Sequence, residues 1–572
     1  MKLEKMRILG KILKWFLLTI VTIVIVFIGW FLLTAIEHPP KVKDLSALAI
    51  ERQKFGENTY FVGNNWLRKS ESGLWEMYIE GDPFERGVAF GKLTSELLSY
   101  QESVFVEQIK KLVPSAGYLK FLKYFTAWFD RNLDKNIPEE YKLEIYGTSF
   151  ACSSKFDFIG SGYQRQLNYH AAHDIGHALK GLNMVGCTSF SCWNGKSADS
   201  TLIVARNFDF SMGPKFAENK IVCFYNPSSG HRFMMVSWAD MIGVVSGMNE
   251  KGLTVTINAA KSSIPTQAST PVTILAREIL QYADNIDQAY AIAQKRKLFV
   301  SESILIGSAN DGKSAIIEKS PDKIDIVYPD TCQIICSNHY QGKAFINDKA
   351  NIENILGSDS QYRFNRVNEL LSENNKIDVP GAVSILRNRL GSGNSDPGMG
   401  NPIAINQLMA HHAVVFKPAR QLVWVSTSPY QLGKFVAYDL NKVFSLTREQ
   451  IISNHEIYTP ELTVPADTFL FSKEYSGYME YLRMSEELKG YSGSRKSLPS
   501  GFEEKYILTN PMFYMTYSHL ADYYRNMKDY GRAYGFCQKA LSMQVAGADQ
   551  KNELKRLSQN LLKRSKHADS GN

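Results

Sequence analysis

The spacing of apolar residues changes at about residue 187, and this change limits the fold more than any other feature of the chain. Between Lys92 and Leu182 the apolar spacing is mostly helical. After Cys187 it predicts short strands separated by turns, at 202–205, 221–225, 233–238, 243–248, 253–258, 303–308, 314–319, 331–337, 413–417 and 422–426. Helical spacing returns at 271–297 and 359–373. The pattern favours the α+β class.

A chain of 572 residues exceeds what one hydrophobic core usually supports, so we expect several units. These are a basic tail (1–14), a transmembrane helix (15–36), a linker (37–73), a helical prosegment (74–186), a strand-rich domain (187–465) and a C-terminal helical region (466–572). The net charge of +8 is mild for this length, and Lys and Arg are scattered. A nucleic-acid partner is therefore not expected.

The run from Trp15 to Ile36 is 22 residues long and carries no charge, enough to cross a hydrocarbon core of roughly 30 Å. A secretory signal peptide is the competing interpretation. The apolar part of a signal peptide is about 7–15 residues and ends at small residues, whereas this run is longer and lacks an Ala-x-Ala site, which favours an uncleaved anchor. More basic residues precede the run than follow it, which predicts a cytoplasmic N-terminus and an extracytoplasmic body.

A strand-to-helix turn is predicted after residues 75–80, with Asp82 as the N-cap and Pro83 in the first helical turn. Three glycines, Gly81, Gly87 and Gly91, surround this turn. They lack the spacing and the Gly-Lys-Ser/Thr ending of a phosphate loop, so we interpret them as packing glycines.

Three histidines, His170, His173 and His177, are spaced to share one helix face, with Asp174 beside them. Such a face could ligate zinc, but no fourth ligand is evident downstream. We therefore expect a solvent-facing or pocket-lining helix, and the sequence predicts neither a metal nor a cofactor.

The C-terminal helical region contains one tetratricopeptide-like pattern of small and aromatic residues: Tyr517, Leu520, Ala521, Tyr524, Ala533 and Ala540. A single unit of this kind cannot bury its apolar face alone. We expect it to pack on the strand-rich domain or on the preceding helices, and a protein contact through it remains an open alternative.

Seven cysteines are too few for a disulfide scaffold, and their pairing is left open. A lone cysteine at the start of a strand, such as Cys187, is most often a small buried hydrophobe. Its neighbours favour reactivity, because Gly186 is an unhindered residue to cleave after and Arg206 and Asp209 follow one strand later. A nearby cation lowers the pKa of a thiol, and a carboxylate can orient an amine.

The segments 186–189 (Gly-Cys-Thr-Ser) and 205–210 (Ala-Arg-Asn-Phe-Asp-Phe) resemble the start of the mature catalytic subunit in N-terminal-nucleophile cysteine amidohydrolases. This group includes the acyl-CoA:6-aminopenicillanic acid acyltransferase family, acid ceramidases and choloylglycine hydrolases. Three further segments resemble family elements in the same order: 248–253 leading to Asn258, 337–340 with Asn338, and 362–366 with Arg363. The resemblance runs from about Tyr78 to about Tyr430 and implies a four-layer αββα catalytic domain.

The resemblance also implies a two-stage mechanism. The Cys187 thiol first attacks the Gly186 carbonyl, and hydrolysis of the thioester frees the α-amine of Cys187. That amine, with an ordinary pKa near 7.7–8.0, then acts as general base while Cys187 forms an acyl-enzyme. Asn258 and Asn338 would bind the oxyanion and Asp209 the amine.

The roles of two arginines also follow from the resemblance, in which Arg206 stabilises the thiolate and Arg363 lines the pocket. Arg206 and Asp209 are three residues apart and point to opposite faces of a regular strand. Both can reach Cys187 only if the chain bends near Asn207. Cys192, Cys332 and Cys336 are interpreted as packing thiols, and the pair His411–His412 as structural, because the free amine already supplies the base.

The leading hypothesis is a membrane-anchored, autoproteolytically activated cysteine amidase or acyltransferase acting on a small-molecule N-acyl amide. The long segment before Cys187 favours the acyltransferase and ceramidase branches over choloylglycine hydrolases. One alternative is a non-catalytic membrane-anchored scaffold with a helical docking module. Another is a lipid-ester hydrolase of the same fold.

Overall fold

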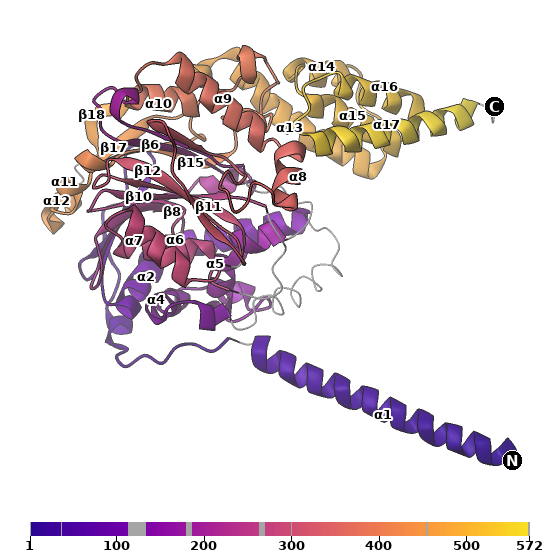
Figure 1. Ribbon diagram of the computed structural model, residues 1–572, viewed down its shortest axis with the longest axis horizontal. Helices are drawn as coiled ribbons and strands as arrows, with labels where there is room; N and C mark the ends of the chain where they lie inside the picture. The colour runs from indigo at the N-terminus through magenta and orange to yellow at the C-terminus, as the bar shows by residue number, and fades with distance from the viewer. Residues whose placement is uncertain are drawn as a thin grey trace.

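The computed structural model describes residues 2–35, 37–112, 133–178, 186–261, 269–298, 300–453 and 456–569. Two β-sheets lie at its centre, with helices on the outer face of each (Figure 1).

The larger sheet has eleven strands in the order β1-β2-β3-β4-β7-β8-β9-β10-β11-β12-β13. Only β4 and β7 pair in parallel, and all other neighbours are antiparallel. The bounds are β1 (Gln53–Phe55), β2 (Thr59–Val62), β3 (Asn65–Lys69), β4 (Trp75–Gly81), β7 (Ile221–Pro227), β8 (Phe233–Ser237), β9 (Ser246–Asn249), β10 (Leu253–Ala259), β11 (Glu302–Ser308), β12 (Lys313–Lys319) and β13 (Ile324–Val327). Four strands of this sheet therefore precede residue 187.

The region expected to be a linker, 37–73, differs from that expectation. It contributes β1, β2 and β3 to the larger sheet, and the side chains of Phe61, Trp66 and Leu67 are buried. The polar composition hid these strands because they lie at the end of the sheet and are short.

The smaller sheet has seven antiparallel strands in the order β14-β5-β6-β15-β16-β17-β18. The bounds are β14 (Gln333–Cys336), β5 (Thr188–Cys192), β6 (Ile203–Asp209), β15 (Ala410–Lys417), β16 (Leu422–Ser426), β17 (Phe435–Asp439) and β18 (Thr459–Val464). β5, the strand that follows Cys187, lies between β14 and β6.

One apolar cluster fills the space between the two sheets. Val204 and Val414 of the smaller sheet meet Phe224 and Leu305 of the larger sheet there. Strands covered on both faces have no polar face, which explains why β6, β10 and β11 are buried along their whole length.

Helices cover both outer faces (Figure 1). The larger sheet carries α2 (Pro83–Leu112), α6 (Val272–Tyr282) and α7 (Ile286–Lys295), with α4 (Glu139–Ser149) packed on α2, and α5 (Gly162–Ala178) contacts α4 and α6. The smaller sheet carries α9 (Ser360–Glu373) and α10 (Val379–Leu386). Shorter helices are α8 (Lys349–Gly357), α11 (Leu440–Val443) and α12 (Arg448–Ile452). The layers are helix, sheet, sheet, helix, so the fold mixes α and β as the sequence predicts.

The glycines after β4 serve close packing, as expected. A Cβ atom added to Gly87 would lie 1.9 Å from the Glu144 carbonyl oxygen, and one added to Gly91 would lie 2.8 Å from that of Thr148. Helices α2 and α4 therefore approach each other along a face that only glycine permits.

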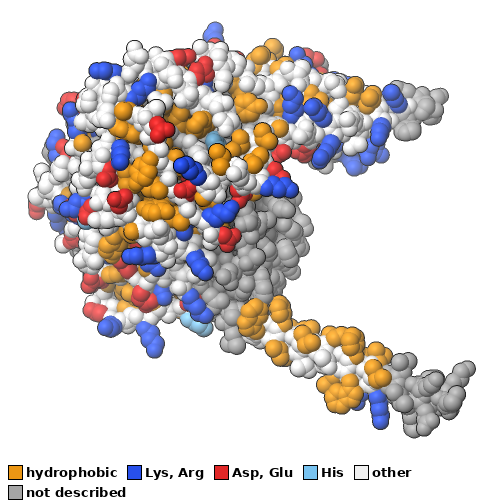
Figure 2. All heavy atoms as spheres, in the orientation of Figure 1, with side chains coloured by type: hydrophobic (Ala, Val, Ile, Leu, Met, Phe, Trp, Pro, Cys, Tyr) orange, Lys and Arg blue, Asp and Glu red, His pale blue; other side chains and the backbone are white. Residues whose placement is uncertain are grey.

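The N-terminal helix α1 (Lys2–Ala35) extends away from the body (Figure 1). Its segment Gly10–Trp30 is long and apolar enough to cross a membrane, and none of that segment is buried. Figure 2 shows apolar side chains along this helix, whereas acidic and basic side chains are interspersed over the visible face of the body. A helix of this kind near the N-terminus fits a membrane anchor and also a signal sequence.

Five helices form the C-terminal region: α13 (Lys473–Ser494), α14 (Phe502–Thr509), α15 (Tyr514–Asn526), α16 (Tyr530–Leu541) and α17 (Ala548–Asp569). All six residues of the tetratricopeptide-like pattern are buried in the cluster that these helices form. Ile403 and Leu408 of the strand-rich domain belong to the same cluster. The region therefore packs both on its own helices and on the strand-rich domain, while its likeness to a tetratricopeptide unit stays a prediction.

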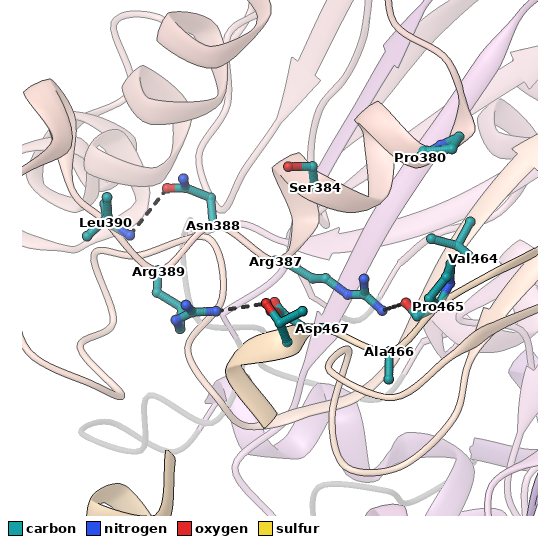
Figure 3. A pocket seen from close by; sticks show the side chains of 11 residues that line it. Pro380, Ser384, Arg387, Asn388, Arg389, Leu390, Val464, Pro465, Ala466 and Asp467 are labelled. Carbon is teal, nitrogen blue, oxygen red and sulfur yellow. Dashed lines mark hydrogen bonds and ion pairs between the residues drawn. The ribbon is translucent and has the colours of Figure 1, made fainter. Parts of the chain in front are cut away.

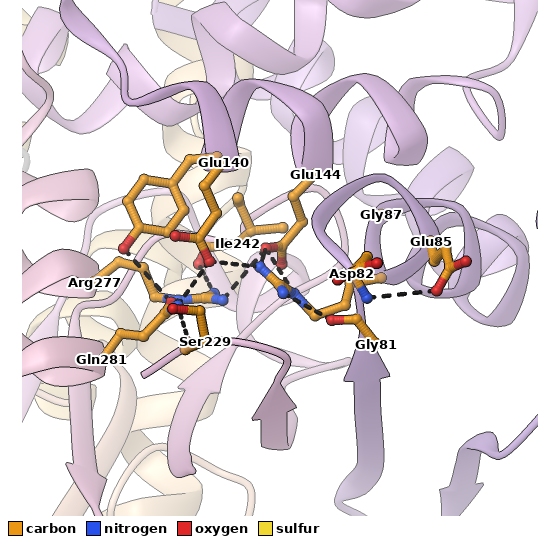
Figure 4. A network of polar contacts seen from close by, with 12 residues as sticks. Gly81, Asp82, Glu85, Gly87, Glu140, Glu144, Ser229, Ile242, Arg277 and Gln281 are labelled. Atoms are coloured by element: carbon orange, nitrogen blue, oxygen red, sulfur yellow. Dashed lines mark hydrogen bonds and ion pairs between the residues drawn. The ribbon is translucent and has the colours of Figure 1, made fainter. Parts of the chain in front are cut away.

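A buried polar network joins helices from before and after residue 187 (Figure 4). Glu144 of α4 accepts from Arg86 of α2 at 2.9 Å and from Arg277 of α6 at 3.3 Å, and none of the three side chains is exposed. Glu140 accepts from Arg86 at 3.0 Å and from Gln281 of α6 at 2.7 Å. The network thus connects the first 186 residues to the rest of the chain without using the peptide bond between them.

Candidate active site

Cys187 lies directly before β5 and is fully buried. Its Sγ atom accepts a hydrogen bond from Nη2 of Arg206 at 3.4 Å. Arg206 comes from the neighbouring strand β6, in which it pairs with Ser189. The resemblance predicted that Arg206 acts on the Cys187 thiol, and the structure brings these two residues into contact.

Three further hydrogen bonds fix the guanidinium of Arg206. Nη1 donates to the Val245 carbonyl at 2.7 Å and to Oγ of Ser246 at 2.5 Å, and Nη2 donates to the Ile257 carbonyl at 2.5 Å. Two of these partners come from strands of the larger sheet, since Ser246 begins β9 and Ile257 lies in β10. Arg206 therefore bridges the sheets beside the thiol.

Burial raises the pKa of the Cys187 thiol to about 11. The positive charge of Arg206 opposes this rise, and the negative charge of Asp209 adds to it. The thiol is thus protonated near neutral pH in this arrangement. A nucleophilic thiolate requires a proton acceptor.

Asp209, at the end of β6, is fully buried. Burial raises the pKa of its carboxyl to about 7, while Arg363 and Arg206 act to lower it. Its Oδ1 atom has no hydrogen-bond partner in the part of the chain that the structure describes. A carboxyl with a pKa near 7 can accept a proton close to neutral pH, where an ordinary aspartate is too weak a base.

A β-bulge lies opposite the end of β6. The register of β15 shifts between Ala410 and His412, which pair with Asp209 and Phe208. The extra residue, His411, lies in β15, whereas β6 continues as a strand from Ile203 to Asp209, so the bend expected near Asn207 stays a prediction. Arg206 reaches the Cys187 sulfur, and the Asp209 carbonyl accepts from the Gly186 amide at 3.1 Å, so both residues flank the Gly186–Cys187 bond.

Arg363, in the first turn of α9, contacts the main-chain carbonyl of Cys187. Its Nη1 atom donates to the Cys187 carbonyl at 2.5 Å and to Oγ1 of Thr188 at 3.0 Å. Its Nη2 atom donates to Oδ1 of Asn338 and to Oδ1 of Asp359, each at 2.8 Å. Arg363 therefore links the candidate nucleophile to Asn338.

Asn258 and Asn338 lie near Cys187, and each already uses its amide. Nδ2 of Asn258 donates to the Cys336 carbonyl at 2.9 Å and its Oδ1 accepts from Oγ of Ser189 at 2.8 Å. Nδ2 of Asn338 donates to the Ala259 carbonyl at 2.8 Å. Each amide nitrogen has two protons, so within the described part of the chain one N–H of each side chain is left for another acceptor.

Gln407 is a site residue that the sequence did not indicate. Its Nε2 atom donates to the Gly186 carbonyl at 2.7 Å and lies 3.5 Å from Oδ2 of Asp209. It follows the loop 391–402 and belongs to no motif, and the 221 positions that separate it from Gly186 leave no local signal.

His411 and His412 are buried and neutral, because burial lowers the pKa of both well below its ordinary value. Nε2 of His412 lies 2.9 Å from Oγ of Ser246, which in turn contacts Arg206. The pair therefore supports the arginine and does not contact the Cys187 sulfur, which agrees with a structural role.

The other cysteines and His170 have structural surroundings. All seven cysteines are free thiols. Cys192 lies in the cluster beneath α9 and α10, on the opposite side of β5 from the cluster that holds Cys187. His170 is buried and accepts from the Ile242 amide at 3.0 Å, so it is neither a metal ligand nor solvent-facing. The side chains of His173, Asp174 and His177 lie outside the described residues, and no group of metal-binding side chains occurs among those described.

A cavity of about 530 Å³ lies at the end of α10 (Figure 3), and none of the predicted site residues lines it. Arg387, Arg389 and Asp467 line it, and Arg389 donates to Asp467 at 3.3 Å. Asn388, which lines the cavity, is connected to the site by a backbone hydrogen bond. Its carbonyl accepts from the amide of Asn406, the residue before Gln407, at 2.8 Å.

Residues 193–400 match the family model of acyl-coenzyme A:6-aminopenicillanic acid acyl-transferase. The chain resembles this acyltransferase family. The match contains Arg206, Asp209, Asn258, Asn338 and Arg363 and begins six residues after Cys187. The resemblance predicted from the sequence is thus confirmed, while the role of Cys187 as nucleophile stays a prediction.

Other relatives are more distant. An uncharacterized protein of Archaeoglobus fulgidus is 26% identical over 284 residues, which cover 45% of this chain and 46% of the relative. The chain thus spans less than half the length of that relative. The Caenorhabditis elegans ortholog of N-acylethanolamine-hydrolyzing acid amidase is 16% identical, with a TM-score of 0.30 over 41% of this chain and 93% of that chain. A mutant of conjugated bile acid hydrolase from Clostridium perfringens is 14% identical, with a TM-score of 0.32 over 45% of this chain and 93% of that chain. These scores are low and imply nothing further about this chain.

Proposed function

We propose that the protein is a self-processing cysteine amidase or acyltransferase that acts on an N-acyl amide through a Cys187 acyl-enzyme. The observation that carries this proposal is the arrangement around one peptide bond. The Cys187 sulfur contacts Arg206, the carbonyl groups on both sides of the Gly186–Cys187 bond accept hydrogen bonds from side chains, and Asp209 lies beside it. The family match over 193–400 supports the same chemistry.

In the first stage, Asp209 accepts the Cys187 thiol proton. The pKa of its buried carboxyl, about 7, suits this transfer near neutral pH. The thiolate, held by Arg206, adds to the Gly186 carbonyl carbon, and the Gly186–Cys187 C–N bond breaks as the nitrogen takes the proton. Water then hydrolyses the thioester and releases the α-amine of Cys187.

In the second stage, the freed amine takes the thiol proton, and Sγ attacks the carbonyl of the N-acyl substrate. The leaving amine takes that proton, which leaves an acyl thioester on Cys187. Water or an acceptor amine then regenerates the thiol. The remaining N–H groups of Asn258 and Asn338 serve as oxyanion donors, and Asp209 holds the amine.

The four layers of helix, sheet, sheet and helix fit an N-terminal-nucleophile core that includes strands from the prosegment. Because β4 pairs with β7 over Trp75–Gly81 and Ile221–Pro227, fragments 1–186 and 187–572 share one sheet. The buried network of Glu144, Arg86 and Arg277 joins them again. We therefore expect the fragments to stay associated after cleavage.

The test is intact mass spectrometry of the purified full chain. The proposal predicts fragments 1–186 and 187–572 from the wild type and a single full-length chain from Cys187→Ala. An intact wild-type chain with full amidase activity would overturn the processing step. An acylating probe directed at cysteine should label Cys187, and paired amide and ester substrates with the same acyl chain distinguish an amidase from a lipid-ester hydrolase.

We further propose that α1 is an uncleaved anchor with its N-terminus in the cytoplasm and the catalytic domain outside. The apolar segment Gly10–Trp30 and the basic residues before it support this orientation. Carbonate-resistant membrane association, combined with protease accessibility of the body from the outer side, tests it. A mature chain that begins after residue 36 would instead identify a signal peptide.

The C-terminal region α13–α17 is proposed to support the catalytic body, with its exposed surface free for a protein contact. Its tetratricopeptide-like residues are occupied in internal packing, which argues against a docking array built on them. Crosslinking of the membrane-bound protein tests for a partner on this region.

A further inference from the structure

Gln407 places an amide donor on the carbonyl group that the self-cleavage attacks. Its Nε2 atom donates to the Gly186 carbonyl oxygen at 2.7 Å, and only 4% of the residue is exposed. We propose that Gln407 is the oxyanion donor of the self-cleavage step, a role that rests on the proposed function of Cys187.

The donor acts at a defined moment of the reaction. As the C–S bond forms between the Gly186 carbonyl carbon and Cys187 Sγ, the carbonyl oxygen takes the electron pair and becomes an oxyanion. A fixed N–H aimed at that oxygen in a buried site strengthens its hydrogen bond as the charge develops. Collapse of the intermediate breaks the Gly186–Cys187 C–N bond, the nitrogen takes the thiol proton, and water hydrolyses the thioester.

Neither predicted oxyanion residue donates to the Gly186 oxygen among the described hydrogen bonds. Nδ2 of Asn258 donates to the Cys336 carbonyl and Nδ2 of Asn338 donates to the Ala259 carbonyl. Among the described hydrogen bonds, the side-chain donor to the Gly186 oxygen comes from Gln407. The carbonyl attacked during self-cleavage belongs to the chain itself, so its oxygen need not occupy the position of the substrate oxygen. The same sulfur would thus use different donors in its two reactions.

The backbone on both sides of Gln407 is held in a defined conformation, and this limits where the side-chain amide of Gln407 can lie. Leu408 has φ of +53°, a left-handed conformation that is unfavourable for a branched side chain and persists only where its surroundings impose it. Its amide donates to Oδ1 of Asn406 at 3.0 Å, and its side chain packs in the cluster of the C-terminal helices. The Asn406 amide in turn donates to the Asn388 carbonyl.

Gly186 is matched to this donor. A Cβ atom at this position would lie 2.7 Å from Nε2 and 2.9 Å from Oε1 of Gln407. Any larger residue would therefore push the amide away from the carbonyl. Glycine at the cleavage junction keeps the donor in place, in addition to leaving the bond unhindered.

The test replaces Gln407 by methionine, which has a similar length and no N–H donor. Conversion of the full chain into two fragments is followed by intact mass, and we expect Gln407→Met to slow it about 10²–10³-fold. Gln431→Met is the matched control, because Gln431 is a buried glutamine too, and its amide donates to a backbone carbonyl, that of Leu386, at 3.3 Å. The control should cleave at the wild-type rate, with thermal midpoints measured for both variants.

A second measurement separates a donor role from a packing role. Gly186→Ala approaches the same contact from the other side and should also slow cleavage. Combined with Gln407→Met it should add little further, since both changes remove one interaction.

The outcomes distinguish the two proposals. A wild-type chain that never cleaves overturns the proposed function and this inference together. If the wild type cleaves and Gln407→Met cleaves at the same rate, this inference alone is overturned. The same holds if the reductions of the cleavage rate by Gly186→Ala and Gln407→Met multiply fully in the double variant. If Gln407→Met fails to fold, Gly186→Ala provides the decision, because an undiminished cleavage rate there also contradicts the donor role.

Discussion

Glu144→Gln is the sharpest test of how the two proposed fragments stay together. Glu144 is fully buried and accepts from Arg86 on α2 and from Arg277 on α6, which belong to different fragments. The amide of glutamine is neutral, so both guanidinium groups would remain buried without this carboxylate. Removing one partner of a buried ion pair costs roughly 3–5 kcal/mol, because a charge is left uncompensated.

The assay compares two backgrounds. In cleaved protein, urea is raised while size-exclusion chromatography follows the separation of 1–186 from 187–572. In the Cys187→Ala background, which is expected to stay uncleaved, the same substitution is followed by circular dichroism. We expect Glu144→Gln to lower the urea midpoint in both, by an amount equivalent to roughly 3–5 kcal/mol.

Glu96→Gln is the matched control, because Glu96 lies on α2 and pairs with Arg52, with 69% and 20% of the two side chains exposed. Exposed pairs contribute about 0–1 kcal/mol, so this midpoint should hardly move. Equal small shifts for Glu144→Gln and Glu96→Gln would refute the assignment of the buried network as the joint between the fragments.

Three further predictions concern buried charges. Burial lowers the pKa of Lys220 from 10.5 to about 7, so its charged form destabilises the fold. Lys220→Met should raise the free energy of unfolding at neutral pH by at most roughly 5 kcal/mol, which is measured as a higher denaturation midpoint. This gain in stability should shrink as pH rises from about 7 towards 10.5, and an unchanged midpoint would contradict the prediction. The raised pKa of Asp209, about 7, predicts that self-cleavage accelerates as pH rises through that value, and rate profiles of wild type and Asp209→Asn should differ by the loss of this rise. Arg206→Met removes the cation that lowers the pKa of Cys187, so cleavage, measured by intact mass, should slow at least about tenfold at neutral pH; a wild-type rate would exclude that role.

Local patterns in the sequence were sufficient for most elements of the core. The strands predicted at 221–225, 253–258 and 314–319 fall within β7, β10 and β12, and the helix predicted at 359–373 matches α9. Apolar runs bounded by turn residues carry this information within a few neighbours. The helical spacing at 271–297 corresponds to two helices, α6 and α7, because Asn285 caps α7 and ends the continuous pattern.

For the candidate site, the sequence indicated the residues and the tertiary structure determined their contacts. Cys187, Arg206, Asp209, Asn258, Asn338 and Arg363 stand in short motifs whose order survives in the linear chain, so the sequence by itself determined them as candidates. Only the tertiary structure decided that Arg206 reaches the sulfur and that both asparagine amides donate to backbone carbonyls.

Three features have no signal in any local stretch. Gln407 contacts Gly186 across 221 positions, Glu144 contacts Arg277 across 133, and the strands at 53–69 extend a sheet whose centre lies beyond residue 220. Each depends on which distant segments pack together, and apolar periodicity specifies that a face is buried without specifying what covers it. The sequence by itself therefore determined the elements and the chemistry of the motifs, and the packing of distant segments decided which side chains meet at the Gly186–Cys187 bond.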